Sequence, residues 1–188
     1  MDTFDIHHVL SSSAHTRKHF IGVYASNRLP STPLPRPAIL VVNLDEDFNP
    51  GSHWVAFYLP QHGQGVEYFD SLGDNTCDHY FSRFMAINGG VLSANSRRLQ
   101  SDFSDVCGEF CCVFASYCSL GYSLPQFVQR FCGDSRRNDR LAVEIFNRHF
   151  SCNTHYARPS LRKIHAQTCS PLCHKKRDRC VMGSTRKH

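Results

Sequence analysis

The segment QSDFSDVCGEFCC, from Gln100 to Cys112, places an amide, a thiol and a glycine at a spacing that could carry out acyl transfer. Cys107 is followed at once by Gly108 and an apolar run, so we expect it in the first turn of a helix. The positive end of the helix dipole and the unsatisfied N–H groups there favour the thiolate, which is the nucleophilic form. The alternative is that Cys107 is one more buried thiol in a cysteine-rich chain.

A thiol nucleophile needs a base, an acceptor that orients the base, and donors for the oxyanion. His53 in GSHWVAF is the candidate base and stands beside Trp54 at the start of a predicted strand. Asp70 in EYFDSLG ends the next predicted strand, and neighbouring antiparallel strands could bring the two side chains together. Gln100 offers an amide N–H ahead of Cys107. Each has a structural alternative, namely a core histidine, a turn-forming aspartate and a surface glutamine.

Three runs of β-branched and aromatic residues, separated by Asn-Pro-Gly and Gly-Gln-Gly turn signals, precede the cysteine segment. They predict a short antiparallel meander: Ala38–Leu44, Ser52–Leu59 and Val66–Asp70. The loop STPLPRP lies ahead of them. A helix at His79–Ile87 and a further strand at Val91–Leu99 are predicted next.

The helix that begins near Cys107 is predicted from one apolar stripe at helical spacing. The stripe consists of Phe110, Val113, Phe114, Tyr117 and Cys118. Ser104 or Asp105 is expected to cap this helix. A last helix is predicted at about Asn138–Phe150. The fold class is therefore α+β, with a short mixed or antiparallel sheet packed against helices and the nucleophile at the N-terminus of a central helix.

The composition predicts a folded domain that is neither secreted by a signal peptide nor membrane-spanning. The 188 residues are 41% hydrophobic and 12% aromatic, too apolar for a disordered chain. The N-terminus has no basic region, and the longest apolar run, Ala38–Val42, cannot span a bilayer. The ten cysteines are then expected to be reduced, with Cys111, Cys112 and Cys118 as core residues.

Charge divides the chain into an expected domain at 1–157 and a tail at 158–188. The tail holds nine Lys/Arg against Asp178 alone, whereas the domain holds twelve Lys/Arg against fifteen Asp/Glu. Such a run of basic residues is usually a solvated tail, and the more specific alternative is that it attracts nucleic acid. The tail also carries Cys and His residues in an irregular spacing that matches no trusted zinc pattern, so we expect no metal site: His165, Cys169, Cys173, His174 and Cys180.

The motifs GSHWVAFYL, YFDSLG and QSDFSDVCGEFCC, in this order and spacing, resemble the adenovirus-type cysteine endopeptidases (adenain) and their relatives in Polinton/Maverick transposons and large DNA viruses. SUMO and NEDD8 deconjugating proteases belong to the same clan. The resemblance runs from His19 to Phe150, about three quarters of the chain. Adenain usually has Glu as the acid partner, whereas Asp-Ser-Leu-Gly is closer to the deconjugating branch.

The resemblance implies an adenain-like fold and a cysteine endopeptidase with His53 as base, Asp70 as its partner, Cys107 as nucleophile and Gln100 as oxyanion donor. Trp54 and Gly108 would form or support the substrate pocket. The implied substrates are virion or transposon precursor proteins. The alternatives are a ubiquitin-like-protein deconjugase and a non-enzymatic, basic, nucleic-acid-binding virion protein.

The resemblance also bears on partners and location. No cofactor is expected to be required, and DNA is a candidate activator through Arg158–His188. The activating disulfide of adenain uses a Cys shortly upstream of the oxyanion Gln, and Asp78–Val106 contains no Cys. We therefore expect no disulfide-linked activating peptide, no membrane association, and an intracellular location in the host nucleus or the virion.

Overall fold

The computed structural model describes residues 1–74 and 79–150. The sheet contains β1 (Phe20–Ala25), β2 (Ala38–Asn43), β3 (Trp54–Leu59), β4 (Val66–Phe69) and β5 (Val91–Ala94), hydrogen-bonded in the order β1-β2-β3-β4-β5. The helices are α1 (Thr3–Ser12), α2 (His79–Ile87), α3 (Cys107–Ser119), α4 (Leu124–Val128) and α5 (Ser135–Phe150), with short 3-10 turns at Thr16–Lys18 and Ser26–Arg28. This arrangement confirms the α+β class.

The sheet is mixed, and its centre is the predicted meander. β2 and β3 are antiparallel, as are β3 and β4, whereas β1 and β5 pair in parallel with their neighbours at the two edges. The strand predicted at Val91–Leu99 ends at Ala94. β1 precedes the proline-rich loop, in a segment for which the sequence patterns predict no strand.

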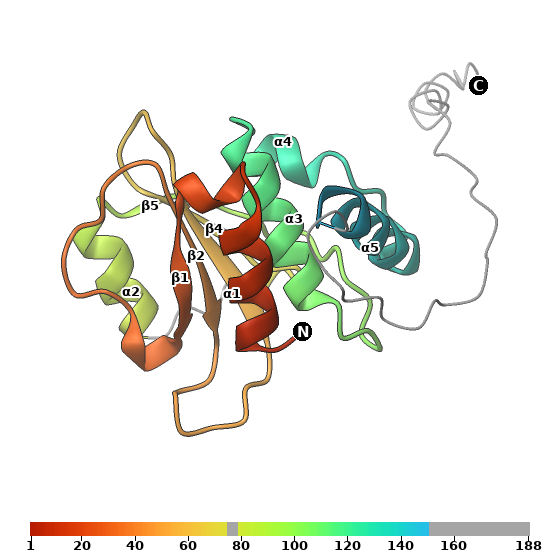
Figure 1. Ribbon diagram of the computed structural model, residues 1–188, viewed down its shortest axis with the longest axis horizontal. Helices are drawn as coiled ribbons and strands as arrows, with labels where there is room; N and C mark the ends of the chain where they lie inside the picture. The colour runs from red at the N-terminus through yellow and green to blue at the C-terminus, as the bar shows by residue number, and fades with distance from the viewer. Residues whose placement is uncertain (75–78, 151–188) are drawn as a thin grey trace, which may run out of the picture. The chain divides into compact units, whose positions relative to one another are not determined.

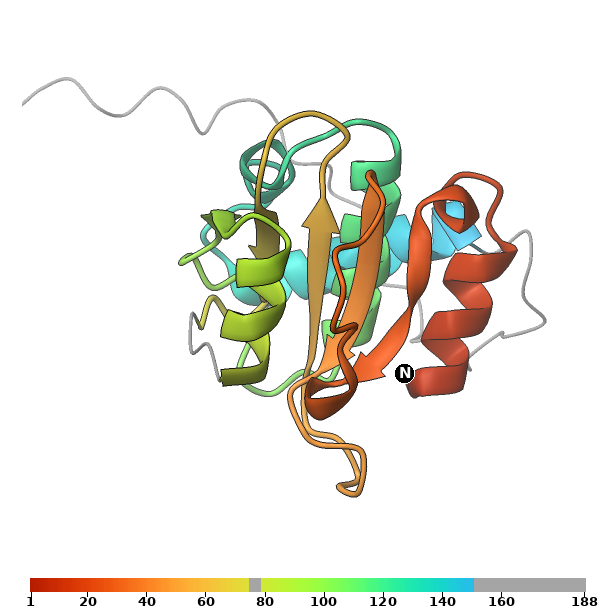
Figure 2. The same cartoon turned by 90° about the vertical axis from the view of Figure 1, so that its left-hand side faces the viewer.

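Helices cover both faces of the sheet, which explains the continuous apolar runs. Every residue of β2 and β3 is buried. In β2, Ile39 and Val41 pack into the cluster that contains α1, α3 and α5, whereas Leu40 and Val42 pack against α2. Figures 1 and 2 show α2 on one face of the sheet and α3 on the other. A strand buried on both faces has no polar side to alternate with.

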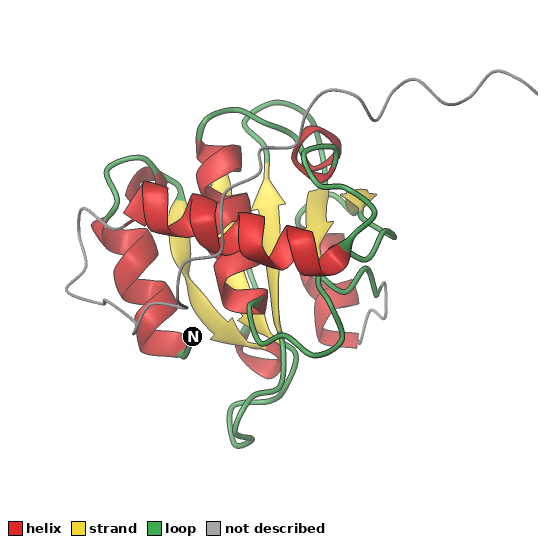
Figure 3. Cartoon of the chain, turned by 90° about the vertical axis from the view of Figure 1, so that its right-hand side faces the viewer, coloured by secondary structure: helices red, strands yellow, loops and turns green. Residues whose placement is uncertain are grey.

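Helix α3 lies at the centre of the molecule, and the prediction of a single buried stripe was wrong. Residues Cys107 to Cys118 are all buried, because the sheet, α1, α4 and α5 surround the helix. Figure 3 shows the helical layer in front of the strands. Cys111, Cys112 and Cys118 lie in this core, and burial raises the pKa of each thiol well above its ordinary value.

The tail lies outside the described residues. The expected boundary after residue 157, the DNA contact and the expectation that the Cys and His residues of the tail form no zinc site therefore stay predictions. Within 1–74 and 79–150, none of the helices has the length and apolar character needed to cross a membrane.

Candidate active site

Cys107 is the first residue of α3, as predicted, and its side chain is nearly buried, with 8% of the residue exposed. The predicted cap was wrong: Val106 occupies the N-cap position, and no side chain makes a capping hydrogen bond. Neither Ser104 nor Asp105 therefore takes up the free N–H groups of the first turn. Those donors lie at the end of the helix that carries the thiol, where they can stabilise negative charge.

His53 connects the thiol to a carboxylate. The residue lies immediately before β3 and is 8% exposed, and its Nε2 is 2.7 Å from Oδ1 of Asp70. Nδ1 is the ring nitrogen that remains for Cys107. Burial by itself lowers the pKa of His53, but hydrogen bonds with Asp70 and Cys107 and the negative charges on both raise it to about 9. The environment therefore favours the protonated, imidazolium form of His53.

Asp70 is both a turn former and the partner of His53. Its Oδ1 also accepts the N–H of Leu72 at 2.8 Å, and its Oδ2 accepts that of Asp74 at 3.2 Å. The residue is 1% exposed, so these bonds satisfy a carboxylate that burial would otherwise destabilise. The two interpretations left open by the sequence are compatible, because the turn fixes the carboxylate that holds the imidazole.

Asn95, which sequence reasoning did not identify, clamps Asp70 from the other side. Its Oδ1 accepts the Asp70 N–H at 2.9 Å, and its Nδ2 donates to the Asp70 carbonyl at 2.6 Å and to that of Arg97 at 3.2 Å. The pairing of β4 with β5 ends at Tyr68 and Ala94. The Asn95 side chain thus continues the ladder by one residue and fixes the backbone from which the Asp70 carboxylate projects.

Gln100 is buried, at 3% exposure, and its amide is oriented by two hydrogen bonds. Oε1 accepts the hydroxyl of Ser71 at 2.6 Å, and Nε2 donates to the carbonyl of Ser104 at 2.7 Å. The Gln100 N–H also bonds to the Ser71 carbonyl at 2.9 Å. The amide nitrogen carries two hydrogens, so one remains beyond the bond to Ser104. The turn after Asp70 therefore positions both the carboxylate and the amide.

Gly73 explains why this turn can lie against the loop that carries Gln100. Its φ is +69°, a backbone conformation that residues with a side chain rarely adopt. A Cβ at this position would lie 2.7 Å from the backbone of Arg97 and Arg98. The glycine of the Asp-Ser-Leu-Gly motif is thus required by close backbone contact.

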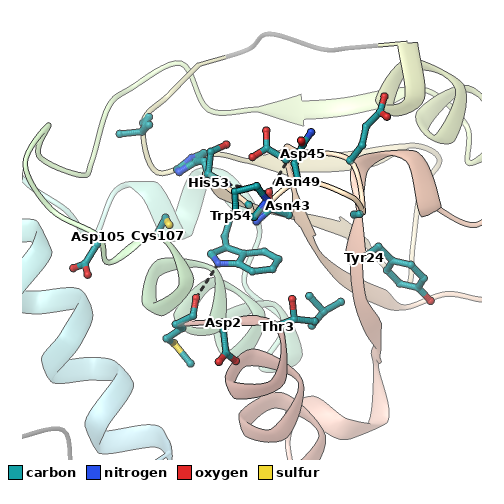
Figure 4. A pocket seen from close by; sticks show the side chains of 18 of the residues that line it. Asp2, Thr3, Tyr24, Asn43, Asp45, Asn49, His53, Trp54, Asp105 and Cys107 are labelled. Carbon is teal, nitrogen blue, oxygen red and sulfur yellow. Dashed lines mark hydrogen bonds between the residues drawn. The ribbon is translucent and has the colours of Figure 1, made fainter.

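A cleft of about 760 Å³ opens above these residues and is lined by His53, Gln100 and Cys107 among others. Trp54 forms part of its wall, and its Nε1 donates to the carbonyl of Met1 at 3.1 Å. Figure 4 shows Cys107 and His53 on one side of the indole. Gly108 does not line the cleft but supports it, because a Cβ there would lie 3.0 Å from Cβ of Met1.

The fold is similar to that of a solved protease, although no family model and no curated protein matches the chain. The ASFV pS273R protease aligns with a TM-score of 0.53 and 17% identity over 79% of this chain and 66% of that chain. A selenomethionine structure of the same protease aligns with a TM-score of 0.41 and 22% identity, over 61% of this chain and 45% of that chain. ChlaDub1 from Chlamydia trachomatis aligns with a TM-score of 0.40 and 17% identity, over 63% of this chain and 61% of that chain.

The chain therefore spans about two thirds or less of the length of these structures. The likeness to the first of them confirms the expected adenain-like cysteine protease fold.

Proposed function

We propose that this protein is a cysteine endopeptidase in which Cys107 is the nucleophile, His53 the general base and acid, Asp70 its orienting partner and Gln100 an oxyanion donor. The observation that carries the proposal is the position of His53. Its Nε2 is held by the buried Asp70 at 2.7 Å, and its pKa is raised to about 9 by interactions with Asp70 and Cys107. A histidine with a purely structural role would not require an interaction with a thiol at the uncapped start of a helix.

In the first half of the reaction, the Cys107 sulfur attacks the carbonyl carbon of the scissile peptide bond. The C–S bond forms as the carbonyl electron pair moves to oxygen, and Nε2–H of Gln100 with the Cys107 N–H stabilises that oxyanion. The intermediate collapses by breaking the C–N bond. His53 gives its proton from Nδ1 to the departing nitrogen, which leaves as an amine.

In the second half, neutral His53 takes a proton from water, and the resulting hydroxide attacks the thioester carbon. A second oxyanion forms at the same donors. Its collapse breaks the C–S bond, releases the carboxylic acid product and returns sulfur and imidazole to their starting state. Asp70 holds the ring through both halves.

Precursor proteins of a virion or transposon are the proposed substrates, and the resemblance in motif order and spacing supports this choice. The alternative within the same chemistry is removal of a ubiquitin-like protein from a conjugate. The specific feature that favours it is the acid partner, because Asp70 occurs in Asp-Ser-Leu-Gly.

The test is a cleavage panel for the full chain. It contains peptides with Leu-x-Gly-Gly and Leu-x-Gly-x-Gly sites, together with ubiquitin-like precursors and conjugates. Cleavage of the peptides supports the endopeptidase, and selective cleavage after a folded ubiquitin-like domain supports the deconjugase. An active-site thiol that never forms a thioester with any member of the panel contradicts both.

The pH profile should show the state of His53. Leaving-group departure needs the imidazolium, so kcat/KM is expected to fall as pH rises through about 9, where His53 loses its proton. Asp70→Asn removes an interaction that raises the pKa of His53, so it should move this alkaline limb of the profile to lower pH. Alkylation of Cys107 delivers no proton to a leaving group, so its rate should not fall above pH 9. A limb that stays in place in Asp70→Asn would refute the assignment.

A further inference from the structure

The cleft beside Cys107 is strongly acidic, although the whole chain carries a net charge of +5. Apart from the imidazolium of His53, the cations along its walls are Arg28 and the α-amino group of Met1. The carboxylates that line it are those of Asp2, Asp45, Glu46, Asp47, Asp102 and Asp105.

Part of this negative charge has no basic side chain as a partner. Arg28 is paired with Asp47 at 2.6 Å, and Arg98, from outside the cleft, is paired with Asp102. Within residues 1–74 and 79–150, these two are the ion pairs that involve a Lys or Arg side chain. Carboxylates near the nucleophile, including Asp45 and Asp105, therefore remain available to a ligand.

The available carboxylates lie on both sides of the nucleophile. Asp105 is exposed and two residues before Cys107, whereas Asp45 belongs to the loop between β2 and β3, next to Glu46, whose Oε1 accepts the Tyr80 hydroxyl at 3.1 Å. In Figure 4, Asp105 lies to the left of Cys107, whereas Asp45 lies to its right, above the indole of Trp54. Like charges along a groove add their fields and concentrate counter-ions there. The cleft thus attracts cations along its length.

Two exposed aromatic residues are neighbours in sequence of cleft-lining residues, and they argue for a polypeptide ligand. Phe48 lies between cleft residues Asp47 and Asn49 and is 76% exposed. Phe103 lies between Asp102 and Ser104 on the other loop and is 94% exposed. Large apolar residues presented to solvent beside a groove are typical of contact surfaces for protein segments.

A metal ion fits this cleft less well. Residues 1–74 and 79–150 contain no group of three or more His, Cys, Asp or Glu side chains arranged to hold one. Nucleic acid is disfavoured as well, because its phosphates would meet the same carboxylates. The carboxylates and the two exposed aromatic residues together match a chain that carries both positive charge and apolar surface.

We infer that the cleft binds an extended polypeptide segment with Lys or Arg on both sides of the bond positioned at Cys107. The inference deepens the proposed function and rests on it only for the statement that this segment is cut. Exposed charge pairs contribute up to about 1 kcal/mol each, so every well-placed contact is worth up to about five-fold in affinity. Several such contacts give a preference that weakens with salt.

The test measures binding separately from cleavage. The full chain carrying Cys107→Ala is titrated with fluorescent peptides of one sequence, in which the positions flanking a central Leu-x-Gly-x-Gly are all Lys, all Gln or all Glu. Anisotropy should give affinities in the order Lys, Gln, Glu, and the difference should shrink between about 50 and 300 mM salt because exposed charges are screened.

Charge-removing variants locate the effect. Asp45→Asn and Asp105→Asn, each combined with Cys107→Ala, should lower the Lys/Glu affinity ratio by about two- to five-fold. The matched control is Glu144→Gln on α5, an exposed carboxylate that does not line the cleft, and it should leave the ratio unchanged.

Equal affinities, a preference for Glu, or no binding of any peptide at millimolar concentration overturns the inference. A ratio that changes equally in Glu144→Gln and the cleft variants overturns it too. Charge-selective binding by Cys107→Ala without cleavage by the wild-type chain would uphold the inference and contradict the proposed function alone.

Discussion

Cys107→Ala is expected to abolish peptide cleavage, and limiting iodoacetamide near neutral pH is expected to label Cys107 before the other cysteines of the wild-type chain. Loss of a nucleophile removes the covalent route altogether, so kcat/KM should fall on the order of 10⁴-fold or more. The labelling preference follows from the imidazolium of His53, whose pKa is raised to about 9, and from the start of α3, because a positive charge and free N–H groups beside a sulfur favour its nucleophilic form.

The other described thiols make this comparison informative. Cys111, Cys112 and Cys118 are buried, and burial raises the pKa of each well above its ordinary value. Cys132 is partly exposed and is therefore the internal competitor. Cys132→Ala should retain full activity and the same fast labelling step, read by peptide mass mapping. Fast labelling at another cysteine with cleavage retained would show that Cys107 is a core thiol.

The central sheet could be predicted from sequence because its signals are local. The runs AILVVNL, SHWVAFYL and VEYFD have strand length and turn residues between them, and strands so close in sequence pair with each other more often than not. The same pairing predicted that His53 and Asp70, at the ends of adjacent strands, would approach each other. Their 2.7 Å contact thus follows from signals that the sequence itself carries.

The supports of the site could not be predicted in this way, because they depend on contacts between distant segments. Ser71 and Gln100 are 29 positions apart, and Asp70 and Asn95 are 25 apart, so no periodicity connects them. The wrong cap prediction has a different cause. Ser104 and Asp105 have suitable side chains, but the Ser104 carbonyl accepts the Gln100 amide, and Val106 takes the cap position. A side-chain cap there would compete for the donors that an oxyanion needs.

The stripe predicted for α3 failed for a related reason. Helical periodicity in a sequence reveals an apolar face that differs in character from the other faces of the helix. Helix α3, however, is buried on all sides by separate elements. Small residues on the other faces, such as Ala115, Ser116, Cys111 and Cys112, fit these close contacts without adding to the stripe. The helix that carries Cys107 is therefore held from several sides, which fixes the direction of its first turn.

Gln100→Ala is expected to lower kcat by on the order of 10²–10³, about 2.7–4 kcal/mol of transition-state stabilisation, while leaving alkylation of Cys107 nearly unchanged. The amide acts on an oxyanion that exists only during the reaction, so the resting thiol does not require it. His53→Ala should instead slow both cleavage and alkylation, because the base assists formation of the thiolate itself.

Ser71→Ala separates the presence of the amide from its orientation. It keeps Gln100 but removes the hydroxyl that bonds to Oε1 at 2.6 Å, so kcat should fall by less than in Gln100→Ala, with alkylation again preserved. Gln61→Ala, at an exposed glutamine, is the matched control and should match wild type. Removing Gln100 leaves the buried hydroxyl of Ser71 and the part-buried carbonyl of Ser104 without this partner, at a cost of about 1–3 kcal/mol in stability. Thermal melting therefore accompanies each assay, and alkylation at the wild-type rate shows that the site remains assembled. Wild-type cleavage by Gln100→Ala, or cleavage and thiol reactivity lost together, would make Gln100 a structural residue and leave the backbone N–H groups of α3 as the only donors to the oxyanion.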